Sequence, residues 1–451
     1  MEKQEKSERK NLNKEKKIIM KRNTKGITLI ALVVTIIVLI ILAGVSINLV
    51  FGNLGIVTKA KEAKRMQEQA ELNEQIALGE LSNEIDKAIN GKGTPTDSPT
   101  GMPTIKELRD SGEFMKKETT AIDSDKNLIK IPQGFKVAKD SGINVTEGVV
   151  IEDKDVIKDI GNNRGNQYVW IPVGTGIKKS DGTTVDITLG RYTFADGTND
   201  KASDGTTVLA KGTPILKQNA ENYTQEVLIN SYYKELAIYR QGVASSGLDG
   251  LNTTSRGKKK ADGTYEGIKS FIDSVKSNGG YYIARYEASY GTDGKANSKV
   301  SNTADDTYGA NPSTEGTLWN NVTQLNAATA CYDIYTTATT DLINSYAWDT
   351  AIVYIQNFSE DTDYSYQYSK NLGNLVNTGT NGDEVCKIND MASNTYEWTT
   401  EYSTNADSSY AIPCISRGGS CNNSYRYTSG RSNCSAPLIG EDGTFRPTLY
   451  M

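Results

Sequence analysis

The chain has 451 residues, a formal net charge of −5 and a sequence pI of about 5.3. This acidic balance argues against nucleic acid as a partner, because binding to phosphates requires a basic surface. Histidine is absent, which excludes Ser-His-Asp and Cys-His nucleophile pairs and the usual histidine-containing zinc sites.

An apolar stretch at residues 27–51 follows a leader, residues 1–26, that is rich in Lys and Arg. The stretch contains no charged residue, and a helix of this length, rising about 1.5 Å per residue, matches a hydrocarbon core of about 30 Å. The basic leader is expected to stay in the cytoplasm. The sequence thus predicts a single-pass membrane protein whose C-terminal domain lies outside, at the cell surface. A secretory signal peptide, the alternative, has a shorter apolar core.

The sequence KGITLI at residues 25–30 resembles the processing site of type IV prepilins and pseudopilins. The resemblance implies cleavage by prepilin peptidase after Gly26 and N-methylation of Ile27. It covers the anchor helix alone, and Ala31 stands where prepilins usually carry Glu, which counts against assembly as a major filament subunit. An anchor that is never cleaved is the alternative, and Met20 is an alternative start to Met1.

Three further segments follow the apolar stretch. Residues 52–90 are rich in Ala, Glu, Lys, Gln and Leu, which favour helix, and their apolar residues recur at helical spacing. We interpret them as a stalk helix. Residues 91–126 open with a concentration of Gly, Pro, Ser and Thr and are interpreted as a linker. Residues 127–451 are expected to form one domain.

The domain at residues 127–451 is predicted to contain short strands separated by turns rich in Gly, Asn, Asp and Thr. The expected strands cover residues 128–131, 148–151, 167–172, 280–288 and 411–417. The expected helices cover residues 222–239, 322–335 and 340–357. Asp-Gly and Gly-Thr pairs at residues 178–219 indicate hairpin tips, since none follows the calcium-binding order of an EF-hand.

Six separated motifs in this domain occur in one order. They are GYYIARYE at residues 280–287, NVT at 321–323, DLINSYAW at 341–348, DMASNTYEWT at 390–399, SRGGS at 416–420 and TFRP at 444–447. In this order they resemble the formylglycine-generating enzyme, or sulfatase-modifying factor, family. The resemblance implies a C-type-lectin-like domain with long loops. The expected fold class is therefore α+β, with an N-terminal transmembrane and stalk helix followed by that domain.

The cysteines depart from the pattern of that family. Its enzymes use two closely spaced cysteines after the Arg-Gly-Gly-Ser motif to hold copper and attack a substrate cysteine. Here Cys421 follows Ser420 directly, but the next cysteine, Cys434, is thirteen positions on. Thiols that share Cu(I) must approach within a few Å. Copper and catalysis are therefore not expected, and a Cys421–Cys434 or Cys386–Cys414 disulfide, or buried thiols, are expected instead.

Five motif residues are expected to serve the scaffold. Trp348 and Trp398 should fill the core, and Arg417 and Arg446 should form internal ion pairs or bind backbone carbonyls. Members of the family bind structural calcium through the turn before Glu397, so the resemblance makes this carboxylate a candidate calcium ligand. A carboxylate bound by backbone N–H groups is the alternative.

The segment CNNSYRYTSGRSNC at residues 421–434 has the composition of antibody-like binding loops, in which rigid amphipathic rings alternate with small hydrogen-bonding residues. Several relatives with the implied fold use the corresponding stretch to contact a ligand. We expect it to bind a protein or a glycan, and a polar loop with no binding role is the alternative. The candidate contact residues are Asn422, Asn423, Tyr425, Arg426, Tyr427 and Arg431.

The sequence therefore predicts a membrane-anchored, pilin-like surface protein that displays a non-catalytic lectin-like head for binding or adhesion. Its expected partners are membrane lipid through residues 27–51, prepilin peptidase and a protein or glycan ligand. One alternative is a copper-dependent cysteine oxidase resembling formylglycine-generating enzyme. Another is a structural minor pilin of a type IV pilus or type II secretion system, which would assemble with other pilin subunits.

Overall fold

The computed structural model describes residues 101–153, 165–220, 226–228, 233–236, 268–291, 294–301, 314–332, 334–403, 414–434 and 443–451, together with residues 11, 13 and 67. The chain divides into two units, Met1–Lys61 and Glu62–Met451, and every element below belongs to the second. The processing site predicted at Gly26 and Ile27 lies outside the described residues, as do residues 27–51 and, apart from Gln67, residues 52–90.

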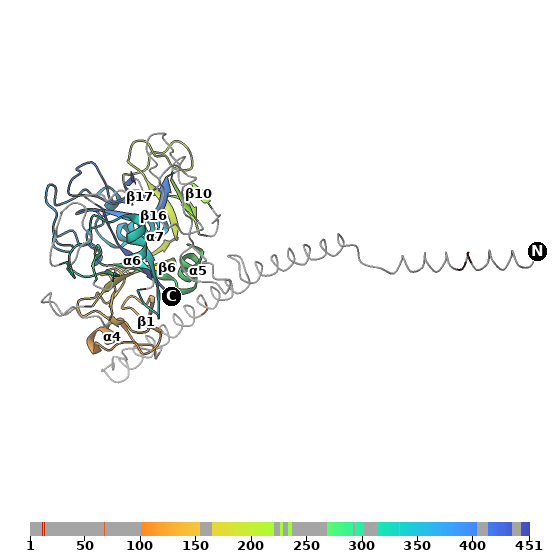
Figure 1. Ribbon diagram of the computed structural model, residues 1–451, viewed down its shortest axis with the longest axis vertical. Coiled ribbons are helices and arrows are strands. Elements are labelled where there is room, and N and C mark those ends of the chain that lie inside the picture. The colour runs from red at the N-terminus through yellow and green to blue at the C-terminus, as the bar shows by residue number, and fades with distance from the viewer. Residues whose placement is uncertain are drawn as a thin grey trace, which may run out of the picture. The chain divides into compact units, whose positions relative to one another are not determined.

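Strands dominate the described part of the chain (Figure 1). Its helices are α4 (Ile105–Ser111), α5 (Ile268–Asn278), α6 (Gln324–Cys331), α7 (Ser345–Phe358) and the 3-10 turn η2 (Tyr364–Tyr366). A membrane span needs about 20 apolar residues, and none of these helices is long and apolar enough to cross a membrane. The predicted α+β class with a transmembrane and stalk helix, and the single-pass membrane localisation, are therefore corrected: the described architecture is mainly β.

One six-stranded sheet forms the larger core, in the order β15-β20-β12-β5-β4-β3 with antiparallel neighbours. Its strands are β15 (Thr339–Leu342), β20 (Pro447–Tyr450), β12 (Gly280–Ala284), β5 (Gln167–Pro172), β4 (Val150–Glu152) and β3 (Lys136–Val137). Every residue of β5 and β12 is buried. Gly280 is required at the start of β12, because a Cβ there would lie 2.3 Å from the indole of Trp170.

A second six-stranded sheet carries the loop on which the predicted contact residues lie. It runs in the order β10-β11-β16-β17-β18, and β19 pairs with β16 in parallel. Its strands are β10 (Glu226–Leu228), β11 (Tyr233–Leu236), β16 (Tyr396–Ser403), β17 (Cys414–Arg417), β18 (Arg431–Cys434) and β19 (Gly443–Phe445).

Four two-stranded ribbons complete the described strands. They pair β1 (Thr119–Ile122) with β2 (Leu128–Ile131), β6 (Gly174–Lys178) with β7 (Thr184–Ile187), β8 (Gly190–Phe194) with β9 (Pro214–Asn219) and β13 (Ser289–Tyr290) with β14 (Ala296–Asn297). Hairpins therefore fill residues 178–219, as the Asp-Gly turns predicted.

Helix α7 lies inside the molecule, against β8, β5, β7 and β16. Its first turn is capped by Asn344, whose side-chain oxygen accepts a hydrogen bond from the N–H of Ala347 at 2.9 Å. Every residue of the helix except Asn357 is buried, as expected for a helix that is covered on all sides. The predicted core positions of Trp348 and Trp398 are confirmed, since their exposed fractions are 0% and 1%.

Most of the predicted elements are confirmed, and one is wrong. Strands β2 and β5 begin and end at the predicted residues, and β4, β12, β17, α6 and α7 overlap their predicted ranges. Residues 222–239, predicted as a helix, instead contain β10 and β11, because β11 pairs with β16. Within the range interpreted as a linker, α4 and β1 are ordered, and Ile105 and Ala121 belong to the main hydrophobic core.

Candidate functional site

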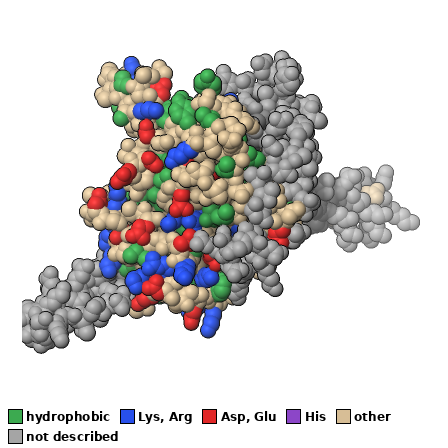
Figure 2. Space-filling view, turned by 90° about the vertical axis from the view of Figure 1, so that its left-hand side faces the viewer, with side chains coloured by type: hydrophobic (Ala, Val, Ile, Leu, Met, Phe, Trp, Pro, Cys, Tyr) green, Lys and Arg blue, Asp and Glu red, His purple; other side chains and the backbone are tan. Residues whose placement is uncertain are grey.

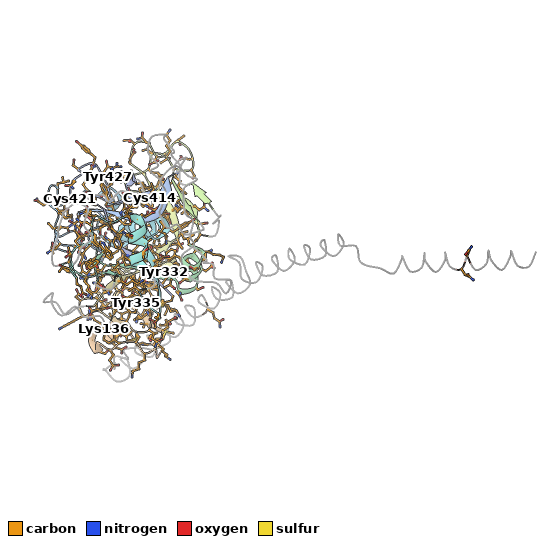
Figure 3. The ribbon with its side chains drawn as sticks, viewed as in Figure 1. Lys136, Tyr332, Tyr335, Cys414, Cys421 and Tyr427 are labelled. Atoms are coloured by element: carbon orange, nitrogen blue, oxygen red, sulfur yellow. The ribbon has the colours of Figure 1, made fainter. Side chains whose placement is uncertain are left out.

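The 420–430 loop connects β17 to β18 and carries most of the predicted contact residues. Its path is fixed by backbone hydrogen bonds, from Asn423 to the carbonyl of Ser420 at 3.2 Å and from Gly430 to the carbonyl of Tyr427 at 2.8 Å. The N–H of Cys421 donates to the carbonyl of Asn394 at 2.8 Å. Cys421 and Tyr427 lie on the same side of the molecule (Figure 3).

The structure places five of the six predicted residues on this loop and turns the sixth inward. The side chain of Tyr425 is 83% exposed. Asn422 is exposed, and the side chains of Asn423, Arg426 and Tyr427 are half-buried. The side chain of Arg431, in β18, is only 8% exposed and pairs with buried carboxylates. Arg431 therefore supports the loop from below.

Donors in the core hold three successive carbonyls at the end of the loop. The indole nitrogen of Trp348 donates to the carbonyl of Thr428 at 3.0 Å. The guanidinium of Arg417 donates to the carbonyls of Ser429 at 3.3 Å and Gly430 at 2.9 Å. Because both donors are fully buried, the return of the loop to the sheet is fixed by the core.

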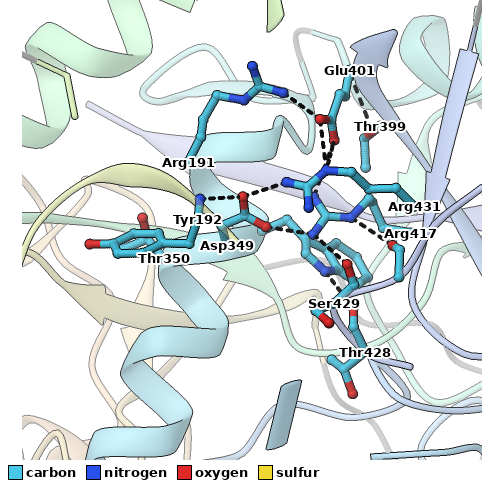
Figure 4. A network of polar contacts seen from close by, with 12 residues as sticks. Arg191, Tyr192, Asp349, Thr350, Thr399, Glu401, Arg417, Thr428, Ser429 and Arg431 are labelled. Atoms are coloured by element: carbon cyan, nitrogen blue, oxygen red, sulfur yellow. Dashed lines mark hydrogen bonds and ion pairs between the residues drawn. The ribbon is translucent and has the colours of Figure 1, made fainter. Parts of the chain in front are cut away.

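A buried ion network lies beneath the loop (Figure 4). Asp349 from α7 binds Arg417 at 2.5 Å and Arg431 at 2.7 Å. Glu401 from β16 binds Arg431 at 2.9 Å, Arg417 at 3.3 Å and also Arg191 from β8. These charge-assisted bonds join α7 to four strands, β8, β16, β17 and β18. The predicted internal ion pairing of Arg417 is confirmed.

The charges of this network determine the ionisation of Glu401. Burial alone would raise the pKa of Glu401, but the guanidinium groups of Arg431, Arg191 and Arg417 hold it at about 2. The carboxylate is therefore ionised at neutral pH. The network consists of three guanidinium groups and two carboxylates, and its role is to hold the loop in place.

A second loop, residues 364–374, runs beside the first. The N–H groups of Thr428 and Ser429 donate to the carbonyls of Gln367 and Ser365 at 3.2 and 3.0 Å, and the N–H of Gly373 donates to the carbonyl of Cys421 at 2.7 Å. This loop was not predicted to be part of the site. The sequence pattern that could have identified it is a tyrosine at every second position, Tyr364, Tyr366 and Tyr368. Tyr364 is buried, and Tyr368 is 42% exposed.

Three tyrosines from the two loops form a row that we call the tyrosine ladder: Tyr366, Tyr427 and Tyr368. The ring of Tyr427 lies 4.9 Å from that of Tyr366 and 4.7 Å from that of Tyr368, centroid to centroid. The hydroxyl of Tyr368 donates to that of Tyr427 at 3.1 Å. On the same two loops, the side chains of Leu372 and Tyr425 are 47% and 83% exposed. Such amphipathic rings suit ligand contact.

The carboxylate of Glu397, the candidate calcium ligand, is paired with the guanidinium of Arg446. The Nε of Arg446 lies 2.6 Å from one carboxylate oxygen, and a second nitrogen of Arg446 binds the other. Arg446 also donates to the carbonyls of Ala284 and Asn389 at 3.1 and 2.9 Å, which confirms its predicted internal role. Among the described residues, no group of three or more His, Cys, Asp or Glu side chains is placed to hold a metal ion.

The strand register separates the two cysteines that a copper site would need. Cys434 lies opposite Cys414 in the pairing of β17 with β18, whereas Cys421 follows the other end of β17. At about 3.3 Å per residue, the three steps along β17 alone span about 10 Å. The thiol of Cys386 is free, so the Cys386–Cys414 disulfide is not formed.

The comparisons with known proteins identify no family. No protein-family model matches the chain, and no curated protein matches it. Among solved structures the chain is similar to Treponema denticola variable protein 1, with 14% sequence identity over 38% of this chain and 85% of that chain. The TM-score of this match is 0.27, which is too low to establish a shared fold.

Proposed function

We propose that this protein is a ligand-binding module, of the kind used in adhesion, whose contact surface is formed by the 420–430 and 364–374 loops. The exposure of Tyr425 carries the proposal: 83% of a large aromatic side chain stands in solvent on a loop whose end is held by buried donors. An exposed ring on a fixed backbone loses little conformational entropy when it binds.

Other side chains of the two loops support this proposal. The tyrosine ladder and Leu372 add aromatic and aliphatic side chains on the same two loops, and exposed aromatic clusters are enriched at binding sites. The oxidase alternative is not supported by the strand register, which separates Cys421 from Cys434. The residues on which the minor-pilin alternative depends lie outside the described part of the chain.

Binding of the full-length chain to arrays of glycans and of displayed peptides tests the proposal. Wild-type protein should bind one class of probe, and the Tyr425→Ala, Tyr427→Ala double variant should lose that binding while keeping the wild-type melting temperature within a few degrees. Lys116→Ala, Lys117→Ala is the matched control, since both lysines are exposed and lie before β1. Binding that survives in the tyrosine variant would overturn the proposal.

A further inference from the structure

The large hydrophobic side chains exposed by the described residues lie on three segments. They are Val208, Leu216, Tyr368, Leu372 and Tyr425. Two belong to the 364–374 loop, one belongs to the 420–430 loop, and two belong to the hairpin formed by β8 and β9. Figure 2 shows hydrophobic side chains exposed at the top of the molecule, with charged side chains densest in the lower half.

The β8–β9 hairpin contacts the 364–374 loop, which is itself hydrogen-bonded to the 420–430 loop. The hydroxyl of Tyr366 donates to the carbonyl of Phe194 at 2.8 Å. Gly212, at φ 83°, approaches so closely that a Cβ there would lie 2.7 Å from the Cα of Asp363. An exposed surface that combines aliphatic and aromatic side chains is typical of protein contact sites.

One end of the tyrosine ladder already holds a cation. The ammonium of Lys211 lies 5.1 Å from the centroid of Tyr366, within the range of cation–π attraction. Its nearest carboxylate, on Asp363, is 4.0 Å away, and both side chains are 47% exposed. An exposed pair at this distance is weak, so the contact can be exchanged for one with a ligand.

Two carboxylates of the β8–β9 hairpin follow the point where it contacts the ladder. Asp196 is two residues after Phe194, whose carbonyl binds the Tyr366 hydroxyl, and the carboxylate of Asp200 accepts a hydrogen bond from the N–H of Asp196 at 3.2 Å. The pKa of the Tyr366 hydroxyl is raised to about 12 by burial and by the charges of Asp196 and Asp200. The pKa of Tyr427 is raised by its hydrogen bond with Tyr368, with a smaller contribution from Asp196. The Tyr366 end therefore attracts cations.

Building on the proposed function, we infer that the ligand is a protein segment that places a Lys or Arg side chain against the Tyr366 end of the tyrosine ladder, beside Asp196 and Asp200. Apolar residues of the same segment cover Leu372 and Leu216. A glycan ligand would leave these aliphatic side chains without an apolar partner. A protein segment with a basic residue next to hydrophobic residues matches both the charge and the hydrophobic surface.

A phage-displayed library of random dodecapeptides, selected on the full-length chain, tests this inference. The selected peptides should carry Lys or Arg next to aromatic or aliphatic residues. Asp196→Asn with Asp200→Asn should weaken their binding on the order of tenfold, because Asn keeps the side-chain acceptor that these turns need. Asp204→Asn, in the same hairpin, is the matched control. Lys211→Ala should strengthen binding, since it removes the internal competitor.

The outcomes separate this inference from the proposed function. Selection of acidic or neutral peptides, or affinity that the Asp196→Asn, Asp200→Asn variant retains, would overturn the inference. Binding to glycans alone, abolished by Tyr425→Ala and Tyr427→Ala, would also overturn it and leave the proposed function standing. Selected peptides that bind the tyrosine double variant as well as wild type would overturn both.

Discussion

The indole nitrogen of Trp348 donates a hydrogen bond to the carbonyl of Thr428 across 3.0 Å. This bond joins the most deeply buried helix, α7, to the end of the 420–430 loop. Two arginines also lie near the indole, with the guanidinium carbons of Arg417 and Arg446 at 5.6 and 6.0 Å from the ring centroid. The packing of this core side chain thus contributes to the position of the loop.

Replacement of this indole should loosen the loop. Trp348→Phe leaves the Thr428 carbonyl without its donor, and we expect a loss of about 1–3 kcal/mol in the free energy of unfolding and faster hydrogen exchange at the amides of Thr428 and Ser429. Trp170→Phe is the matched control, because Trp170 is fully buried and its indole N–H has no partner among the described residues. Equal exchange rates at Thr428 in the two variants would contradict this account.

The buried ion network should contribute far more to stability than an exposed ion pair. Arg431→Met leaves Asp349 and Glu401 with fewer partners in the core, and breaking such a buried pair costs about 3–5 kcal/mol. The control is Lys106→Ala, which removes an exposed pair with Asp110 at 2.7 Å and should cost about 0.2–1 kcal/mol. Urea unfolding measures both values. A cost for Arg431→Met as small as that of the control would show that the network does not stabilise the fold.

Acid should weaken the same network. The pKa of Glu401 falls from its ordinary value of 4.5 to about 2 in the folded chain. A lowered pKa contributes stability above the ordinary value, and this contribution is lost as the pH falls from about 4.5 towards about 2. Over this pH interval, the free energy of unfolding measured in urea should therefore fall less steeply for Glu401→Gln than for wild type. Parallel pH profiles for wild type and variant would rule out the lowered pKa.

Copper should not bind between Cys421 and Cys434. The register places Cys434 opposite Cys414, at the end of β17 away from Cys421. A Cu(I) titration of the full-length chain should give the same result for wild type, Cys421→Ser and the remote control Cys386→Ser. Tight binding that both Cys421→Ser and Cys434→Ser abolish would show that these thiols converge and would favour the oxidase alternative.

The sequence predicted well those elements whose local pattern agrees with their final environment. Strand β5 is an apolar run that is buried along its whole length, and α7 carries its Asn cap at the start. Residues 222–239 contain helix-favouring residues, yet β11 pairs Tyr233 with Ser403 of β16. That long-range pairing outweighs local propensity. The paired residues are far apart in the sequence, so no local pattern could have predicted the pairing.

The candidate site was predicted only in part, because some of its features also depend on contacts between residues far apart in the sequence. The composition of the 420–430 loop indicated Tyr425 and Tyr427, but the inward direction of Arg431 follows from Asp349 and Glu401, which lie far from it in the sequence. Asp349 carries a visible signal, since it is a charged residue in a helix that is otherwise largely apolar. The 364–374 loop joins the site only in the folded chain, through its backbone hydrogen bonds with Cys421, Thr428 and Ser429.

Hydrogen exchange of the full-length chain, with and without the tightest-binding glycan or peptide from the screens, tests the central claim most directly. Bound ligand should slow exchange at the amides of residues 422–430 and 366–373. These amides lie on the two loops that carry the exposed tyrosines. Slowed exchange confined to other segments, such as α4 or the β1–β2 ribbon, would contradict it.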